Sequence, residues 1–382
     1  MRVVIAGTMP EPSIDVHTIG VVAGLKAVRP DWEIIAIKPA AIDRSSSSLS
    51  VRIWKYYERF WHFPRMIAQQ KADIFHIIEP CEGHLVYHLK KKQKQVPVVV
   101  TCHDLINFYY RDNVQNSVKL PIVSSGAWEH SVKGMKYADH IISVSAATAK
   151  DTTELLGIEP ARITVAPNAV DTSFRPASLT EKAAIRQKYG ISPDKICLLT
   201  VGSIHPRKNT DNILKAVKIL VERGLPLHFL KAGAEFSSEQ KHFIASHGLH
   251  QHISYIGKPD KSTLIQIYGT ADILLTPSVG EGFGMTILEA MACGTPVVTS
   301  NTSAMPEVAG DAGVLVDPKD PESIADGVCL LHQDPIYYQE LVKRGLVRVK
   351  PYTWDNTAEK IAQVYEKLLD KTATSQLANT GV

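Results

Sequence analysis

Residues 276–296 read TPSVGEGFGMTILEAMACGTP, and our prediction of the fold starts from them. The run 273–276 leading into it is apolar and β-branched, as in a strand buried on both faces of a sheet. Three glycines then interrupt the chain, and a short helical pattern begins near Met285 and stops at Gly294. A strand, a glycine loop and a helix in this order form the unit from which parallel α/β sheets are built.

The same alternation of apolar runs and helical patterns occurs twice along the 382 residues. Runs that are apolar throughout fit strands of a parallel sheet, and the amphipathic segments between them fit right-handed crossover helices. Each half of the chain therefore predicts a doubly wound α/β sheet. The predicted strands are 3–6, 34–37, 74–78, 98–101, 141–144 and 163–166 in the first half, and 196–201, 227–232, 253–256, 273–276, 297–299 and 314–316 in the second.

The break between the two series lies near residues 171–176. We predict two Rossmann-like domains, 1–173 and 177–350, facing one another across a cleft, because such sheets bind ligands at the carboxyl ends of their strands. A helix over 355–369 is expected to cross back onto the first domain. The small, polar tail 371–382 is expected to be disordered.

Composition narrows the class of protein. A formal net charge of +3 gives no case for nucleic-acid binding, and five scattered cysteines without a CxxC pair argue against a zinc site or a disulfide framework. The apolar run at the N-terminus is too short for a signal peptide, and no run reaches the roughly 20 apolar residues that cross a bilayer. We therefore expect a cytoplasmic protein whose contact with a membrane is at most peripheral.

Two acids in the stretch 276–296 fit the recognition of vicinal hydroxyls. Glu281 lies in the glycine loop, and Glu289 lies in the helix that follows. A carboxylate accepts two hydroxyl hydrogen bonds, so the two acids could hold a sugar and a ribose, while the helix start suits a phosphate. The alternatives are a solvated loop acid at Glu281 and a buried acid with a backbone partner at Glu289.

Two further candidates follow predicted strands. Residues 200–209 read TVGSIHPRKN, without the GxGxxG of dinucleotide-binding folds, and Arg207 and Lys208 could supply positive charge to a diphosphate instead. His103, in the first half, follows a strand directly and could bond a donor hydroxyl or phosphate or move a proton. The alternatives are a solvated basic pair, and a satisfied histidine beside a capping Asp104.

Taken together, these residues resemble the retaining GT-B glycosyltransferases of family 4. Glu281 and Glu289 match that family's E-x7-E motif, and His103 with Asp104 resembles its HD pair. The resemblance covers nearly the whole chain and implies a GT-B fold, with an interdomain cleft between two facing Rossmann-like domains. The other segments that carry it are 143–148, 165–171, 202 with 206–209, 306–310 and 313–318.

The resemblance implies a role for each site residue. Glu281 would bind hydroxyls of the donor sugar near the reacting carbon, and Glu289 would bind the ribose. Arg207 and Lys208 would neutralise the leaving diphosphate in place of a metal ion, so no metal or other cofactor is expected. The remaining residues expected at the donor, chiefly through their backbone, are Gly202, Ser203, Gly282, Phe283, Gly284, Met285 and Thr286.

Some positions depart from the family's pattern or argue against a metal. Ser203 stands where many members carry Arg, and Pro12-Ser13 begins the segment that replaces the first-domain Gly-Gly loop. No DxD motif is convincing. His76 and Glu79 resemble a metal-binding pair, but residues three apart on a strand point to opposite faces, so we interpret them as structural.

We therefore predict a retaining, metal-independent transferase that moves a sugar from a UDP- or GDP-sugar to a hydroxyl of a saccharide or lipid-linked acceptor, in polysaccharide or glycolipid biosynthesis. One alternative is a nucleotide-sugar epimerase or hydrolase on the same fold. Another is a sugar-nucleotide sensor without catalysis.

A membrane surface is a separate expectation. Segment 51–70 mixes bulky aromatic and basic side chains, and the lysines in 89–95 end another helix. Together they could bind anionic headgroups at the inner membrane face, which would favour a lipid-linked acceptor. The alternative is a core-packing helix and a solvated helix end.

Overall fold

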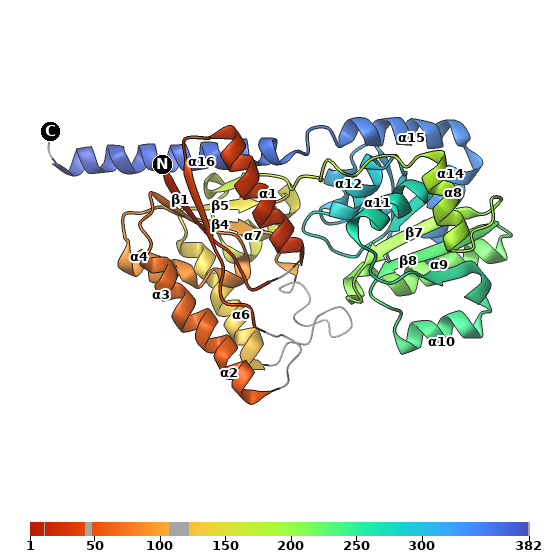
Figure 1. Ribbon diagram of the computed structural model, residues 1–382, viewed down its shortest axis with the longest axis horizontal. Coiled ribbons are helices and arrows are strands. Elements are labelled where there is room, and N and C mark those ends of the chain that lie inside the picture. The colour runs from red at the N-terminus through yellow and green to blue at the C-terminus, as the bar shows by residue number, and fades with distance from the viewer. Residues whose placement is uncertain (11, 43–47, 107–121, 381–382) are drawn as a thin grey trace. The chain divides into compact units, whose positions relative to one another are not determined.

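The computed structural model describes residues 1–10, 12–42, 48–106 and 122–380, and the chain divides into two compact units (Figure 1). The first unit draws on residues 1–105, 119–169 and 352–382, and the second mainly on 170–351. Each unit contains one six-stranded sheet in which all paired strands are parallel. The predicted α/β fold, with a doubly wound parallel sheet in each half, is confirmed.

The sheet of the first unit has the order β2-β1-β3-β4-β5-β6. Its strands are β1 (Arg2–Ala6), β2 (Glu33–Ile37), β3 (Ile74–Ile77), β4 (Val98–Cys102), β5 (His140–Ser143) and β6 (Ile163–Val165). The helices of this unit are α1 (Pro12–Val28), α2 (Leu49–Tyr57), α3 (Phe63–Ala68), α4 (Leu85–Lys92), α6 (Ile122–Gly134), α7 (Ala146–Leu156) and α16 (Trp354–Thr380).

The sheet of the second unit has the order β12-β11-β10-β7-β8-β9. Its strands are β7 (Ile196–Gly202), β8 (Leu227–Gly233), β9 (Ile253–Tyr255), β10 (Ile273–Thr276), β11 (Val297–Ser300) and β12 (Gly313–Val316). The helices are α8 (Leu179–Lys188), α9 (Thr210–Glu222), α10 (Ser238–Ser246), α11 (Lys261–Thr270), α12 (Met285–Ala292), α13 (Met305–Ala309), α14 (Pro321–Gln333) and α15 (Pro335–Arg348).

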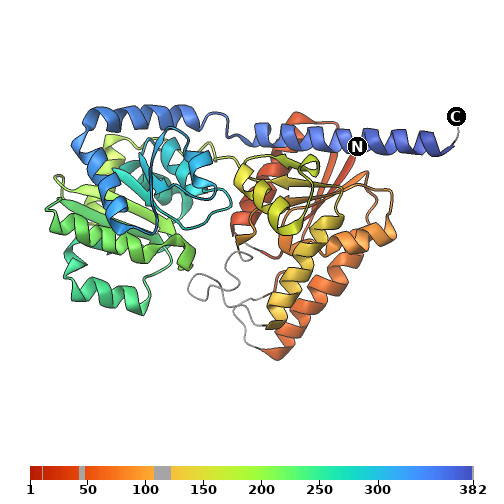
Figure 2. The same cartoon turned by 180° about the vertical axis from the view of Figure 1, so that it is seen from behind.

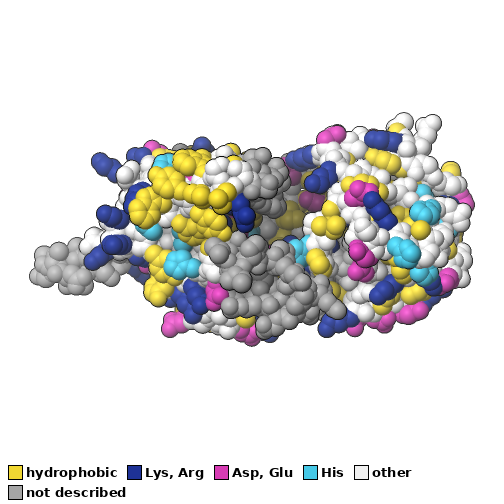
Figure 3. All heavy atoms as spheres, turned by 90° about the horizontal axis from the view of Figure 1, so that it is seen from below, with side chains coloured by type: hydrophobic (Ala, Val, Ile, Leu, Met, Phe, Trp, Pro, Cys, Tyr) yellow, Lys and Arg dark blue, Asp and Glu magenta, His cyan; other side chains and the backbone are white. Residues whose placement is uncertain are grey.

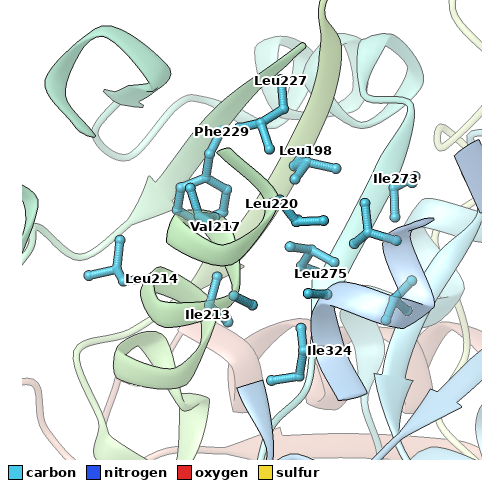
Figure 4. Packing of buried hydrophobic residues seen from close by; sticks show 14 of the residues in the cluster. Leu198, Ile213, Leu214, Val217, Leu220, Leu227, Phe229, Ile273, Leu275 and Ile324 are labelled. Carbon is cyan, nitrogen blue, oxygen red and sulfur yellow. The ribbon is translucent and has the colours of Figure 1, made fainter. Parts of the chain in front are cut away.

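Apolar packing explains why the strands could be found in the sequence. In the second unit, Leu198, Phe229 and Leu275 project from three strands onto side chains of α9 and α14 (Figure 4). These strand residues are at most 1% exposed, since helices cover the sheet. All twelve predicted strands are present, each within one residue at either end.

The segment predicted as one helix over 51–70 is divided. Helix α2 passes into a π-helix over Glu58–His62, in which the N–H of Phe63 bonds the carbonyl of Glu58, and α3 follows. Pro64 has no backbone N–H, so a regular α-helix would lack one backbone hydrogen bond here. The wider π-helical turn lies directly before this position.

The C-terminal helix α16 packs along α1 in the first unit (Figures 1 and 2). Gly20 and Gly24 of α1 allow this contact, because a Cβ on Gly20 would lie 2.1 Å from the Trp354 ring. Arg29 bonds Glu359 at 2.8 Å and Glu366 at 2.7 Å.

Helix α16 also extends further than predicted. We expected a helix over 355–369 and a disordered tail over 371–382, but α16 continues to Thr380. No glycine or proline interrupts this stretch, and Thr372 and Thr374 each donate from the hydroxyl to the carbonyl four residues earlier. The helix therefore has no signal that would end it at Leu369.

Candidate functional site

The site in the second unit is built at the carboxyl ends of two neighbouring strands. Strand β10 pairs directly with β7, so the loops that follow them meet at one edge of the sheet. The loop after β7 contains a short 3-10 turn, Pro206–Lys208, and the loop after β10 leads to α12. Residues far apart in the sequence are thereby brought together.

Glu281 is held between two cations from the other loop. Its Oε2 lies 2.5 Å from Arg207 Nη1, and its Oε1 lies 2.6 Å from Lys208 Nζ. Burial by itself would raise the pKa of Glu281, but the charges of Lys208 and Arg207 outweigh it and lower the pKa to about 2. The carboxylate is 8% exposed and ionised, so the alternative of a solvated loop acid is wrong.

Backbone contacts fix this arrangement. Arg207 also donates to the carbonyl of Gly280 at 3.2 Å, and its own carbonyl accepts the N–H of Val279 at 2.9 Å. Ser303 bonds Glu281 twice, accepting from its N–H and donating to its carbonyl. The loop that carries Glu281 is thus tied to the loop after β7.

Two residues of this scaffold were not identified as site residues from the sequence. Asn209 has a positive φ of 61° and donates from Nδ2 to the carbonyls of Pro277 and Pro318, at 2.8 and 2.6 Å. Ser303 also has a positive φ, of 57°. Asparagine tolerates the left-handed region, and its position after Arg207 and Lys208 was the one available signal.

The glycine loop delivers the start of α12 to the same edge of the sheet. Gly284 has φ +106° and is the N-cap of α12, so no side chain caps the first turn. The N–H groups at Met285 and Thr286 lie at this helix start, where the dipole favours an anion. Gly282 and Phe283 precede it in the loop, and the Phe283 side chain is buried.

Glu289 lies on α12 and bonds a neighbouring helix. Its Oε2 accepts the hydroxyl of Tyr268 in α11 at 2.6 Å, so its partner is a side chain rather than a backbone donor. Burial raises the pKa of Glu289, although Tyr268, Lys208 and Lys261 act in the opposite direction. The charge of Lys208 therefore lowers the pKa of both Glu281 and Glu289, although its direct contact is with Glu281.

Gly202 and Ser203 end the strand that leads to the cations. Gly202 packs closely against the next strand, because a Cβ on Gly233 would lie 2.2 Å from its carbonyl oxygen. The Ser203 side chain is exposed and accepts from the N–H of His205 in its own loop at 3.4 Å. It therefore leaves Arg207 and Lys208 as the cations contributed by this loop.

His103 belongs to the first unit, directly after β4. Its Nε2 lies 2.9 Å from the carbonyl oxygen of Ile78, and burial lowers its pKa to about 4. The ring is thus neutral at neutral pH, with the proton on Nε2. His76, by contrast, bonds Thr101 and Tyr365 and lies in the sheet, in agreement with its structural interpretation.

The described residues contain no group of three or more His, Cys, Asp or Glu side chains placed to hold a metal ion. The segment beginning at Pro12 and Ser13 forms the start of α1, and its first two side chains lie outside the described residues. No helix within the described part of the chain is long and apolar enough to span a membrane.

Two family models match the chain, one in each half. Residues 22–174 match Glycosyltransferase Family 4, and residues 181–348 match Glycosyl transferases group 1. The second match contains Glu281, Glu289, Arg207 and Lys208. These matches and the relatives below indicate a glycosyltransferase.

Two of the relatives are named as sugar transferases. The chain is 30% identical over 231 residues to O-antigen chain mannosyltransferase B of Escherichia coli, covering 60% of each chain. It is 28% identical over 241 residues to D-inositol 3-phosphate glycosyltransferase of Rhodococcus erythropolis, covering 60% of this chain and 54% of the relative. The matched region thus spans less than two thirds of these relatives.

Solved structures with the same fold cover almost the whole chain. Sucrose-phosphate synthase from Thermosynechococcus elongatus superposes with a TM-score of 0.76 at 18% identity, covering 97% of this chain and all of that one. Anabaena HepE, solved with UDP and glucose, gives a TM-score of 0.76 at 15% identity, covering 96% and 100%. These likenesses show that the fold is GT-B.

Proposed function

We propose that this chain, in which a Family 4 region is followed by a group 1 region on a GT-B fold, is a retaining glycosyltransferase that needs no metal ion. It would move a sugar from a UDP- or GDP-sugar to a hydroxyl group of a saccharide or lipid-linked acceptor during glycan biosynthesis. The observation that carries the proposal is the buried Glu281 held by Arg207 and Lys208 beside the start of α12.

The chemistry follows from charge. A nucleoside diphosphate leaves with negative charge, which Arg207, Lys208 and the helix start at Met285 would stabilise in the transition state. Glu281 keeps both cations in place and would accept hydroxyl hydrogen bonds from the donor sugar. The acceptor hydroxyl would attack the anomeric carbon from the side of the leaving group and pass its proton to a departing phosphate oxygen, which retains the configuration.

The relatives support the substrate classes. One is named for mannose transfer to an O-antigen chain, and HepE was solved with UDP. Glu289 would bind the ribose shared by the candidate nucleotides, since a carboxylate accepts two hydroxyls.

Ligand binding tests the donor class directly. We expect UDP- or GDP-sugars to raise the melting temperature of the full chain, in a panel with ADP-sugars, because a ligand bound to the native state stabilises it by mass action.

A transfer assay with purified chain treated with a chelator would test whether the reaction needs a metal ion. Loss of turnover on chelation, restored by Mg²⁺, would count against a metal-independent reaction.

A surface of the first unit supports peripheral contact with an anionic membrane. Ile53, Trp54, Tyr57 and Trp61 of the segment 51–70 are exposed, and the space-filling view shows hydrophobic side chains gathered on the first unit with basic ones beside them (Figure 3). Trp54 and Trp61 are 52% and 56% exposed. Phe63 and Ile67 of the same segment are buried, as the alternative of a core-packing helix expects, but that alternative does not account for the exposed tryptophans.

A basic pocket adjoins this surface. Its volume is about 450 Å³, and it lies between α3 and α4, with the Arg65 guanidinium 3.8 Å from the centre of the Trp61 ring. A lipid phosphate beside interfacial tryptophans would fit this combination of charge and aromatic surface. Lys90, although part of the segment 89–95, is paired with Asp139 instead. The lining residues are Arg65, Ala68, Gln69, His88, Lys91 and Lys92.

Cosedimentation with vesicles tests this surface. We expect the chain to bind vesicles containing phosphatidylglycerol, and the triple variant Arg65→Ala, Lys91→Ala, Lys92→Ala to bind them at least about tenfold more weakly, since each basic residue contributes about 1 kcal/mol near an anionic surface. The control removes the same charge from the second unit, at Lys182, Lys188 and Lys215. Equal binding by both variants would reject the surface.

A further inference from the structure

Three polar side chains lie together at the carboxyl edge of the first sheet. Glu79 follows β3, His103 follows β4, and His17 comes from α1. The rings of His17 and His103 meet edge to face, with centroids 4.5 Å apart, and His103 Nε2 lies 3.9 Å from Glu79 Oε2. The three groups therefore form one continuous polar cluster.

Hydrogen bonds determine which nitrogen of His17 carries the proton. His17 Nδ1 lies 2.9 Å from Asn168 Oδ1, an amide oxygen that can only accept, so Nδ1 is the donor and Nε2 presents a lone pair. His17 is 4% exposed, and burial together with His103 and His76 lowers its pKa well below the usual range. Among the described residues, the buried Nε2 has no hydrogen-bond partner.

Glu79 also has a buried polar atom without a hydrogen-bond partner, its carboxyl oxygen Oε2. Its carboxyl accepts the backbone N–H of Cys81, but its Oε2 is buried without a partner among the described residues. Burial, then the charges of Asp104 and Glu82, raise the pKa of Glu79 to about 8, and Arg59 only partly opposes them. At neutral pH the carboxyl is therefore mostly protonated and can donate.

Glu82, three residues along the chain, is a buried acid whose two carboxyl oxygens both accept hydrogen bonds. It is 1% exposed, and its oxygens accept the Thr8 hydroxyl at 2.9 Å and the Arg59 guanidinium at 3.3 Å. The contrast matters because buried polar groups in native proteins are almost always paired. Glu79 and His17 keep a donor and an acceptor ready for a partner that the described chain does not supply.

The chemistry of this pair selects the partner. A hydroxyl group both donates and accepts, so it satisfies a protonated carboxyl and a bare imidazole nitrogen together. A phosphate would meet the lone pair of His17 and two nearby acids, Glu79 and Asp104, and is disfavoured. We propose that Glu79 Oε2 and His17 Nε2 bind hydroxyl groups of one uncharged sugar unit, an assignment that rests on the proposed glycosyl transfer and replaces the structural interpretation of Glu79.

Binding measurements separate the two sources of that sugar, the donor and the acceptor. Calorimetry would compare UDP with UDP-glucose and GDP with GDP-mannose, and saturation-transfer NMR would follow methyl α-mannoside and methyl β-glucoside. We expect Glu79→Leu and His17→Phe to weaken either the nucleotide sugar or the free glycoside at least tenfold while leaving UDP and GDP unchanged. The matched control is His140→Phe, which removes another buried histidine of this sheet, bonded to Thr164.

A pH series keeps the test independent of folding. Glu79→Gln retains an N–H donor, so it should bind the sugar within about threefold of wild type. Wild-type affinity should fall as pH rises through 8, since the folded carboxyl then loses its proton, whereas Glu79→Gln should not respond there. The groups that act on Glu79 are Arg59, Cys81, Glu82, His103 and Asp104, and His17 contacts the His103 ring.

The outcomes are distinct. Unchanged sugar affinity in both variants, with normal nucleotide binding, rejects the Glu79 and His17 site and leaves the glycosyltransferase proposal standing. The site is likewise rejected if wild type and Glu79→Gln share one pH profile. A wild-type chain that binds neither nucleotides nor nucleotide sugars rejects both proposals.

Discussion

Lys208 Nζ lies 2.6 Å from Glu281 Oε1, although 73 residues separate the two in the chain. The contact exists because β7 and β10 are neighbours in the second sheet, so that the loops at their carboxyl ends meet. In this structure Glu281 neutralises Arg207 and Lys208, the two cations that would otherwise attract a diphosphate. The acid and a diphosphate are both anions and would compete for Lys208, so Glu281 can serve catalysis while it weakens nucleotide binding.

Replacing Glu281 by glutamine should affect these two functions in opposite directions. Turnover should fall by about 10²–10³-fold, the loss typical of removing one preorganised electrostatic contact. The affinity for UDP or GDP should be unchanged or higher, because the cations lose a competing anion. Steady-state kinetics and calorimetry would measure both, with the exposed Glu235→Gln as control. Near-normal turnover in Glu281→Gln would defeat the assignment.

Removing a cation should weaken the nucleotide. Arg207→Ala is expected to lower the affinity for UDP or GDP by about 1.5–3 kcal/mol, the range for hydrogen bonds that involve a charged group. Arg223→Ala is the matched control, since Arg223 forms ion pairs with Glu322 and Asp326 in the same unit and lies outside the site. Calorimetry at two salt concentrations would measure the difference. Equal affinities for the two variants would remove Arg207 from the donor site.

The pH dependence of stability follows from the same ion pairs. Glu281 has a folded pKa of about 2, against 4.5 for the free side chain. Because the folded pKa is lowered, its stabilising contribution is complete above pH 4.5 and is lost as pH falls toward 2. Glu281→Gln should therefore flatten this part of the acid unfolding curve, measured by circular dichroism. Parallel curves for the variant and wild type between pH 4.5 and 2 would contradict the buried charge pair.

The sequence was sufficient to locate the strands and to single out Glu281, Glu289, Arg207 and Lys208 as candidates, but not Asn209 or Ser303. Buried parallel strands leave continuous apolar runs, and the glycine loop with Glu281 and Glu289 is contiguous. The sheet order, which joins Arg207 to Glu281, is not written in any local pattern. Nor could local patterns show that Tyr268 would be the partner of Glu289, because that bond joins two helices.

Other features depended on tertiary contacts that the pattern of residue types does not report. The unpaired atoms of Glu79 and His17 appear only when all their neighbours are placed. The length of α16 was underestimated because small polar residues were interpreted as a disordered tail, although no glycine or proline in them ends a helix before Thr380. Glycines in α1 gave a usable signal that was not interpreted, since two of them four residues apart allow close helix packing.

Those glycines provide a last prediction, about stability. In α1, a methyl group at Gly20 would lie 2.1 Å from the Trp354 ring, and one at Gly24 would lie 2.5 Å from the Trp354 carbonyl oxygen. Overpacking of this kind costs about 1–3 kcal/mol, so Gly20→Ala should lower the melting temperature and loosen α16 in hydrogen exchange.

Gly126 is the matched control, because it also lies inside a helix, α6, and a Cβ there would meet nothing within 4 Å. Helix propensity alone should make Gly126→Ala neutral or more stable by up to about 1 kcal/mol. A stabilised Gly20→Ala variant would mean that α16 does not pack on α1 at this distance. Donor binding by the second unit should persist in Gly20→Ala, since Arg207 and Glu281 belong to a separate compact unit.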